Sequence, residues 1–216
     1  MNIPTNWTFK DSEIASGFDS HVREQLPWYE LATNMVSIIA KNYISNDGIV
    51  YDIGASTGNI GLSMREVIKS RNAKLFAIEQ SSEMAALYNG GGKLIIGDAC
   101  EFQYERFSLA VSFLSLMFID IESRVKLIKK LKENVKRGGA IIIVEKANPS
   151  NGYLGTVLRR LTMEWKLGNG ATPEDVINKD ISLSGVQRPI SDELDDDFIE
   201  FFKMGEFSGW IMEGKK

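Results

Sequence analysis

The sequence predicts an α/β fold: a doubly wound, mainly parallel β-sheet with helices on both faces and a C-terminal antiparallel hairpin. From residue 49 onward, short β-rich apolar runs alternate with segments of helical periodicity, which is the pattern of successive βαβ units. The apolar run at residues 141–144 is typical of a strand that is covered on both faces. With 216 residues the chain suits one domain, since a domain ordinarily takes about 100–200 residues.

The expected elements follow in chain order. Strands are expected at residues 49–53, 74–78, 93–96, 109–114 and 140–144. Helices are expected between them at residues 59–70, 81–88 and 121–136, and the last two run into glycine clusters that stop helices. A helix at residues 20–43 is expected to lie over the sheet through Met35, Ile38 and Ile39. Residues 154–167 predict a late helix, which a loop-rich stretch and a hairpin at residues 198–212 follow.

Composition excludes several kinds of site. Cys100 is the single cysteine and His21 the single histidine, so the chain lacks an internal disulfide and the clusters of a zinc or iron–sulfur site. No run approaches the roughly 18 apolar residues of a membrane span, and the first residues lack a signal-peptide pattern, so a cytoplasmic protein is expected. The net charge of −4 does not attract nucleic acid, and the lysines within residues 126–136 are interpreted as a solvated helix face.

Residues 50–58 carry the strongest local signal, because an apolar strand there turns through glycines into a helix. Gly54 and Gly58 let the backbone pass close to a ligand, and the helix start offers unpaired N–H groups. A dinucleotide site has a glycine where Ser56 stands, and that glycine is what admits the pyrophosphate. Asp52 would repel phosphate but suits a ligand with an ammonium group. The alternative is a glycine turn that holds no ligand.

Acidic residues follow the next strands of the predicted sheet. Glu79 is placed to accept both hydroxyls of a ribose, and Asp98 is placed to accept from an adenine amino group. Taken singly, Glu79 is equally a helix-entry acid and Asp98 a turn residue. Together with Asp52 they stand at the carboxyl ends of consecutive strands, where open α/β sheets bind ligands.

The order Asp52-x-Gly54-x-x-x-Gly58, Glu79 and Gly97-Asp98 resembles the class I S-adenosylmethionine (AdoMet) dependent methyltransferases, which have a Rossmann-like, seven-stranded-type sheet. Within that class, nearly the whole chain is similar to the carboxy-AdoMet synthase group, enzymes of tRNA wobble-uridine modification. The stretches that carry this resemblance are Asn6-Trp-Thr-Phe9, Phe18-Asp19, Pro27-Trp-Tyr29, Tyr51-Asp-Ile-Gly54, Ala77-Ile-Glu-Gln80, Gly97-Asp98 and Gly138-Gly-Ala140 with Glu145-Lys146.

The resemblance implies AdoMet as the cofactor and divides the single domain into a helical cover (1–48), a cofactor-binding core (49–146) and a substrate-side part (147–216). Tyr29 would close over the methionine end, unless it is simply a core residue. Glu79-Gln80 would hold the ribose, and Asp98-Ala99 would flank the adenine. The residues expected to line the cofactor pocket are Tyr29, Asp52, Gly54, Ala55, Ser56, Gly58, Glu79, Gln80, Asp98, Ala99 and Phe113.

Departures from the synthase group shape the expected function. The group has an arginine after the late helix that clamps the extra carboxylate of carboxy-AdoMet, and here Asp180 falls at that position, with Lys179 or Arg188 as substitutes. Phe113 replaces an asparagine after the fourth strand, and the C-terminal part lacks a helix before the last hairpin. We therefore expect an AdoMet-dependent methyltransferase that acts on a small molecule or a modified nucleotide.

Other functions stay open at this point. Carboxyl transfer to AdoMet, as in the resembled group, is the alternative, and a catalytically silent AdoMet-binding subunit is a further one. A tRNA partner and a homodimer follow only from the resemblance, and neither a membrane partner nor a metal is expected.

No catalytic base stands out, because the sulfonium of AdoMet supplies the reactivity and the protein mainly aligns an acceptor. Candidates at the expected mouth of the pocket are Tyr29, Glu145 and Tyr153. Tyr153 and Trp165 would form an aromatic wall for the acceptor or, alternatively, pack the late helix. His21 is expected to be structural.

Overall fold

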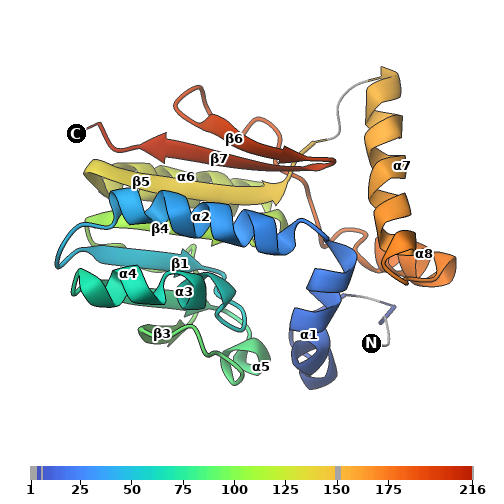
Figure 1. Cartoon of the computed structure of the whole chain (residues 1–216), viewed down its shortest axis with the longest axis horizontal. Helices are drawn as coiled ribbons and strands as arrows, with labels where there is room; N and C mark the ends of the chain where they lie inside the picture. The colour runs from blue at the N-terminus through green and yellow to red at the C-terminus, as the bar shows by residue number, and fades with distance from the viewer. Residues whose placement is uncertain (1–3, 6, 149–151, 216) are drawn as a thin grey trace.

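The computed structural model describes residues 4–5, 7–148 and 152–215. The strands are β1 (Ile49–Ile53), β2 (Lys74–Glu79), β3 (Lys93–Ile96), β4 (Phe107–Phe113), β5 (Val135–Lys146), β6 (Ile199–Met204) and β7 (Phe207–Glu213). In the described part of the chain they form a seven-stranded sheet of order β3-β2-β1-β4-β5-β7-β6 (Figure 1). β1 to β5 pair in parallel, whereas β7 is antiparallel to β5 and β6. The predicted fold class is confirmed.

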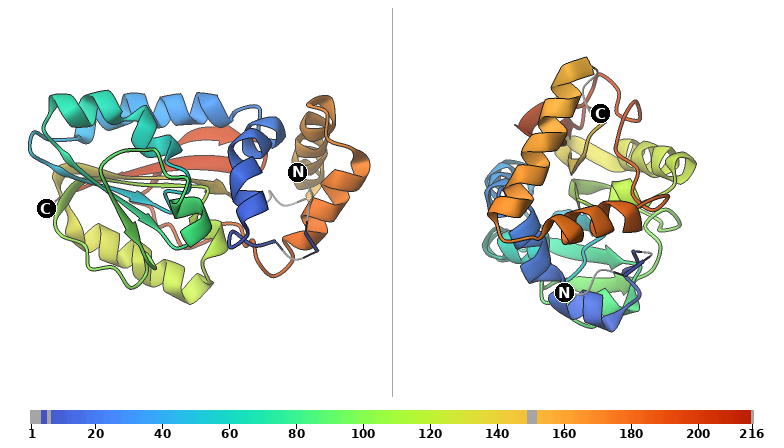
Figure 2. Two further views of the ribbon diagram at one scale, coloured as in Figure 1. Left: turned by 90° about the horizontal axis from the view of Figure 1, so that it is seen from below. Right: turned by 90° about the vertical axis from the view of Figure 1, so that its right-hand side faces the viewer.

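Helices cover both faces of the sheet (Figure 2, left). α2 (Tyr29–Tyr43), α3 (Asn59–Ser63) and α4 (Arg65–Ser70) lie on one face, and α6 (Ile121–Asn134) lies on the other. Successive strand residues point to opposite faces, so Val50 belongs to the core beneath α2 and Tyr51 to the core beneath α6. β1 and β4 are therefore buried on both faces, which explains their nearly continuous apolar sequence.

A further set of helices gathers at the carboxyl end of the parallel strands (Figure 1). These helices are α1 (Ser12–Gln25), α7 (Gly152–Gly168) and α8 (Pro173–Ser182). The backbone amide of Trp7 donates to the carbonyl of Ser182 at 3.0 Å, so the segment before α1 is tied to α8. The helices thus enclose the end of the sheet at which α/β folds bind their ligands.

The single helix predicted at residues 20–43 is wrong, because the structure has α1 and α2 with a break between them. Pro27 explains the break: the residue before a proline is disfavoured in the helical region, and Leu26 has φ −128° and ψ 86°. Ile38, predicted to face the sheet, is 61% exposed. The residues of α2 that pack on the sheet are Ala32, Val36 and Ala40, with Met35 and Ile39 partly buried against the same core.

Other predicted elements differ at their boundaries. The helix at residues 59–70 is interrupted at Met64, which gives α3 and α4. The helix at 121–136 ends at Asn134, and Val135 already starts β5. The helix at 81–88 is reduced to α5 (Ser82–Ala85).

The stretch predicted as rich in loops contains α8. This helix starts with a capping box between Thr172 and Asp175 and has Pro173 at the first helical turn, so its start signal is present in the sequence. The chain then runs from Leu183 to Phe198 without a helix before β6. None of the helices in the described ranges is long and apolar enough to cross a membrane.

Candidate functional site

A cleft opens at the carboxyl ends of β1, β2, β3 and β4. The sequence-predicted site residues that line it are Tyr29, Asp52, Gly54, Ala55, Ser56, Glu79, Gln80, Asp98, Ala99 and Phe113. Among the described residues, Gly58 is the member of the predicted set that does not line the cleft. The structure therefore gathers side chains from separate strand ends, as the sequence indicates.

The glycines of the turn after β1 have different structural roles. Gly58 has a φ of 102°, which side chains rarely adopt, and a Cβ there would overlap the backbone of Gly90. Gly54 has a φ of 69°, and a Cβ there would overlap Ser115 Oγ. Gly58 thus supports packing against the loop before β3, whereas Gly54 marks a close approach between the turn after β1 and the turn after β4.

Asp52 brings a buried carboxylate to the cleft. Its side chain accepts a hydrogen bond from the backbone of Gly61, while Oδ2 is buried and has no hydrogen-bond partner among the described residues. Burial raises the pKa of Asp52 to about 7, the amide of Gly61 opposing and the charge of Glu79 adding to the shift. A buried acceptor without a donor is costly. The position therefore suits a ligand that brings a cationic donor.

Glu79 fixes the turn after β1 from the end of β2. Its Oε2 accepts the backbone N–H of Ser56 and its Oε1 accepts that of Ser81, each at 2.7 Å. Ser56 has a φ of 51°, a left-handed conformation that is strained for a residue other than glycine. Burial raises the pKa of Glu79, and the backbone amides that it accepts oppose this shift. Each carboxylate oxygen retains capacity to accept from a ligand hydroxyl.

Asp98 lies in the wall of the cleft on an exposed turn after β3. Its Oδ1 accepts the backbone N–H of Cys100 at 2.8 Å. Asp98 therefore stabilises a turn and also lines the cleft, so the two roles that the sequence suggests for its position do not exclude each other.

Aromatic rings close the cleft on the side of α2. The ring of Tyr29 meets that of Phe113 edge to face, with 5.3 Å between centroids, and the Arg23 guanidinium lies 5.2 Å from the Tyr29 ring centre. Burial raises the pKa of Tyr29 well above its usual range, so this hydroxyl stays protonated. Tyr29 is both a core residue and part of the cleft wall.

Sequence reasoning missed the aromatic residues that the N-terminal segment brings to the cleft. Phe9 and Phe18 line it, and Phe9 meets Phe118, from the 3-10 helix η1 (Leu116–Phe118), with 4.9 Å between ring centroids. The carbonyl of Phe9 accepts the hydroxyl of Ser81 at 2.6 Å. Other missed lining residues are Thr57, Asn59, Ile60, Ile78, Met84, Leu114, Ser115 and Ile119.

The sequence contains a signal for two of these aromatic residues of the cleft. Phe9 and Phe18 belong to stretches that carry the family resemblance, although the resemblance assigns them no role. Asn6, in the first of these stretches, lies outside the described residues.

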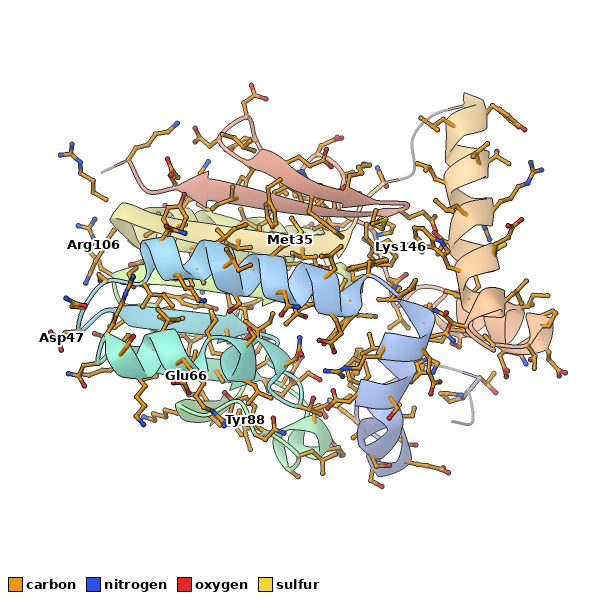
Figure 3. The ribbon with its side chains drawn as sticks, viewed as in Figure 1. Met35, Asp47, Glu66, Tyr88, Arg106 and Lys146 are labelled. Atoms are coloured by element: carbon orange, nitrogen blue, oxygen red, sulfur yellow. The ribbon has the colours of Figure 1, made fainter. Side chains whose placement is uncertain are left out.

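An adjoining cavity shares part of the wall of the cleft. The residues that line both are Phe9, Phe18, Leu114 and Phe118. The basic residues in the lining of this cavity are His21, Lys146, Arg159, Lys166 and Lys179, and the acidic ones are Asp180 and Glu206. Figure 3 shows Lys146 between the carboxyl end of the sheet and α7. The excess of basic groups suits an anionic ligand. We refer to this space as the cationic cavity.

Buried nitrogen atoms without partners lie in the lining of the cationic cavity. Trp7 Nε1, His21 Nε2 and Lys179 Nζ have no hydrogen-bond partner among the described residues, and the Lys179 ammonium lies over the Trp7 ring. Burial and the charge of Lys166 lower the pKa of Lys179 to about 6. Burial and the charge of Lys179 lower the pKa of His21 to about 4. An anionic ligand would accept hydrogen bonds from these groups and would favour the charged forms of His21 and Lys179.

Asp180 does not face this cavity as an uncompensated negative charge. Its carboxylate pairs with Arg159 Nη2 at 2.8 Å, and the two side chains are 54% and 57% exposed. The repulsion that the sequence predicts at Asp180 is therefore offset by Arg159, and the buried amine beside it is that of Lys179. Arg188, the other substitute considered, is not among the described residues that line the cavity.

The candidate bases differ in their positions. Glu145 is 0% exposed, so its placement at the mouth of the pocket is wrong. Tyr153 is 76% exposed and lies outside the described lining, whereas Trp165 is partly buried against the core. The aromatic acceptor wall does not form, and Trp165 packs the late helix. No group of His, Cys, Asp and Glu that could hold a metal ion occurs in the described ranges.

Solved structures with a similar fold are AdoMet-dependent methyltransferases. One from Methanococcus maripaludis aligns over 100% of this chain and 98% of its own, with a TM-score of 0.58 and 17% identity. The plantazolicin methyltransferase, in complex with S-adenosylhomocysteine, aligns over 94% of this chain and 89% of its own, with a TM-score of 0.59 and 14% identity. The fold is that of the class I AdoMet-dependent methyltransferases.

Sequence relatives narrow this class, although no family model matches the chain. The carboxy-S-adenosyl-L-methionine synthase of Staphylococcus epidermidis is 36% identical over 193 residues, which are 87% of this chain and 84% of that protein. The synthase of Shewanella piezotolerans is 27% identical over 212 residues, 93% of this chain and 86% of that protein. The chain belongs to the carboxy-S-adenosyl-L-methionine synthase family, as its sequence resemblance predicts.

Proposed function

We propose that the chain binds AdoMet in the cleft and acts as an AdoMet-modifying enzyme of the carboxy-AdoMet synthase type. Family membership supports the proposal. The observation that carries it is the set of buried nitrogens in the cationic cavity that have no hydrogen-bond partner in the described part of the chain. Carboxy-AdoMet differs from AdoMet by an added carboxylate. Lys179, Trp7 and His21 offer the donors that such a carboxylate and its source would use.

The residues of the cleft fit AdoMet part by part. Asp52 Oδ2 has the unmet acceptor for the ammonium of the methionine moiety, and Glu79 has acceptor capacity for the ribose hydroxyls. Asp98-Ala99 would flank the adenine, and Tyr29 with Phe113 would exclude water at the methionine end. Bound AdoMet would supply a sulfonium-activated methyl group, and the protein would position it against the neighbouring cavity.

Methyl transfer to a small molecule or a modified nucleotide is the second candidate. It is favoured by Asp180, an acid in the lining of the cationic cavity at the position of the family's arginine. The pairing of Asp180 with Arg159 weakens this argument. A homodimer, a link to tRNA and a cytoplasmic location are proposals that rest on the family resemblance.

Titration calorimetry with AdoMet, S-adenosylhomocysteine and carboxy-AdoMet tests the proposed function. The wild-type protein is expected to prefer carboxy-AdoMet. Lys179→Met is expected to raise the Kd of carboxy-AdoMet by about tenfold or more, because it removes a charge-assisted hydrogen bond, and to leave the Kd of AdoMet unchanged. Lys129→Met, on an exposed site with 78% side-chain exposure, is the matched control.

Each other outcome of this titration has a definite meaning. Equal affinities of the wild type for AdoMet and carboxy-AdoMet would favour methyl transfer, and mass spectrometry of the products would then identify the acceptor. Binding of AdoMet without turnover of any acceptor would favour the silent subunit. If the protein bound none of the three ligands, the cofactor assignment would be refuted.

The affinity for AdoMet is expected to rise by about tenfold between roughly pH 6 and pH 8. The pKa of Asp52 is raised to about 7 by burial, so the carboxylate that pairs with the ammonium forms only as the pH passes that value. Because the pKa of Asp52 is higher in the folded protein than in the unfolded chain, protonation of Asp52 stabilises the unliganded protein. This stabilisation is greatest below about pH 4 and is lost as the pH rises through about 7. Calorimetry across this range, with Asp52→Asn as reference, measures the effect. Parallel pH profiles of the two proteins would contradict it.

A further inference from the structure

Glu145, near the end of β5, is a fully buried acid with 0% exposure. Its Oε1 accepts the backbone N–H of Ser115 at 2.8 Å and that of Leu116 at 2.7 Å, and its Oε2 accepts that of Met117 at 3.3 Å. The Ser112 hydroxyl donates to Oε1 at 3.2 Å. The carboxylate therefore caps the start of η1, where the backbone amides have no partner within the helix.

The turn that Glu145 caps is strained. Leu114, between β4 and η1, has a φ of 56°, a conformation that is unfavourable for a bulky side chain. Its backbone amide donates to the carbonyl of Val144 at 2.7 Å. Strained residues persist where the surroundings fix them, and here consecutive residues of β5, Val144 and Glu145, supply the fixing hydrogen bonds.

This turn forms part of the cofactor cleft. Leu114, Ser115 and Phe118 line the cleft, and Leu114 and Phe118 also line the cationic cavity. The turn lies so close to the turn after β1 that a Cβ at Gly54 would overlap Ser115 Oγ. A shift of Ser115 by the width of a methyl group would thus change the space in which the methionine end of a cofactor would lie.

We propose that Glu145 is a positioning residue, whose carboxylate holds the turn after β4 in the strained shape that the cofactor cleft requires. The role rests on the proposed function, because it is the AdoMet-binding cleft that the turn shapes. Lys146, the next residue, points to the opposite side of the strand and lines the cationic cavity. Of these two neighbouring residues of β5, Glu145 thus contacts the turn that lines the cofactor cleft, and Lys146 lines the cationic cavity.

Glu145→Gln tests this role, because glutamine has the same size but turns an N–H donor toward backbone donors. We expect the Kd of AdoMet to rise by about tenfold or more, in a protein whose circular dichroism shows that it is fully folded at the temperature of the titration. A residue that only stabilised the fold would lower the melting temperature and leave the Kd unchanged. Glu133→Gln, on the exposed side of α6 with 61% side-chain exposure, is the matched control.

Hydrogen exchange of the wild-type protein tests the anchoring without a variant. The amides of Ser115 and Leu116 are expected to exchange far more slowly than those of the exposed residues Asp195 and Asp196 in the loop before β6. Exchange as fast as in that loop, or a Kd of Glu145→Gln within about twofold of the wild type, would overturn the positioning role while the wild type still bound AdoMet. Failure of the wild type to bind AdoMet would instead overturn the proposed function.

Discussion

Glu79→Ala is expected to weaken AdoMet binding by about ten- to a hundredfold, because a hydrogen bond to a charged group contributes about 1.5–3 kcal/mol. The substitution removes the carboxylate that would accept from the ribose hydroxyls. It also removes the acceptor of the backbone amides of Ser56 and Ser81, which lie 2.7 Å from its oxygens. The left-handed conformation of Ser56 then loses the hydrogen bond that holds it. Titration calorimetry with AdoMet measures the loss.

Glu101→Ala is the control for this experiment, since Glu101 is an exposed glutamate outside the cleft lining. Its affinity for AdoMet should equal that of the wild type. A correctly folded Glu79→Ala protein that kept full affinity would show that the ribose is held elsewhere and that the cofactor assignment of the cleft is misplaced.

Arg124→Ala is expected to lower the free energy of unfolding by about 3–5 kcal/mol, the usual cost of breaking a buried ion pair from one side. Arg124 pairs with Glu193, and their side chains are 0% and 5% exposed. Its Nη1 also donates to the carbonyl of Arg188 at 2.8 Å. The substitution would leave the Glu193 carboxylate buried without its cation. Urea denaturation measures the change.

A double variant separates the ion pair from the packing around it. Arg124→Met with Glu193→Gln should recover much of the lost stability, because removing both charges leaves neither one unpaired. Arg160→Ala, at an exposed arginine of α7, should change the free energy of unfolding by less than about 0.5 kcal/mol. A loss below about 1 kcal/mol in Arg124→Ala would mean that water reaches the Glu193 side chain.

Local sequence signals were sufficient for the sheet and for most of the cleft. Each parallel strand is a short apolar run, and the acid or glycine that follows it stands at the same edge of the sheet as the others. Asp52, Glu79 and Asp98 could therefore be placed together without knowledge of the tertiary structure. The break between α1 and α2 and the start of α8 also have local signals, which are Pro27 and the capping box of Thr172 and Asp175. The apolar periodicity of residues 20–43 conceals the first of these signals, and the polar composition after residue 167 conceals the second.

The cationic cavity could not be predicted in this way, because its residues come from segments that only the fold brings together. His21 lies on α1, Lys146 at the end of β5 and Lys179 on α8. The charge of Asp180 was overestimated for the same reason, since its partner Arg159 is on another helix. The role of Glu145 was also invisible, because the amides that it accepts belong to a turn thirty residues earlier in the chain.

The aromatic rings shared by the cleft and the cationic cavity would link the binding of ligands in the two spaces thermodynamically. Phe9, Phe18 and Phe118 contribute to both spaces, so any ligand that displaces a ring on one side alters the shape offered to a ligand on the other. Such coupling is reciprocal: the factor by which the first ligand changes the affinity for the second equals the factor in the opposite direction. The change in AdoMet affinity caused by a bound substrate would therefore also give the change in substrate affinity caused by bound AdoMet.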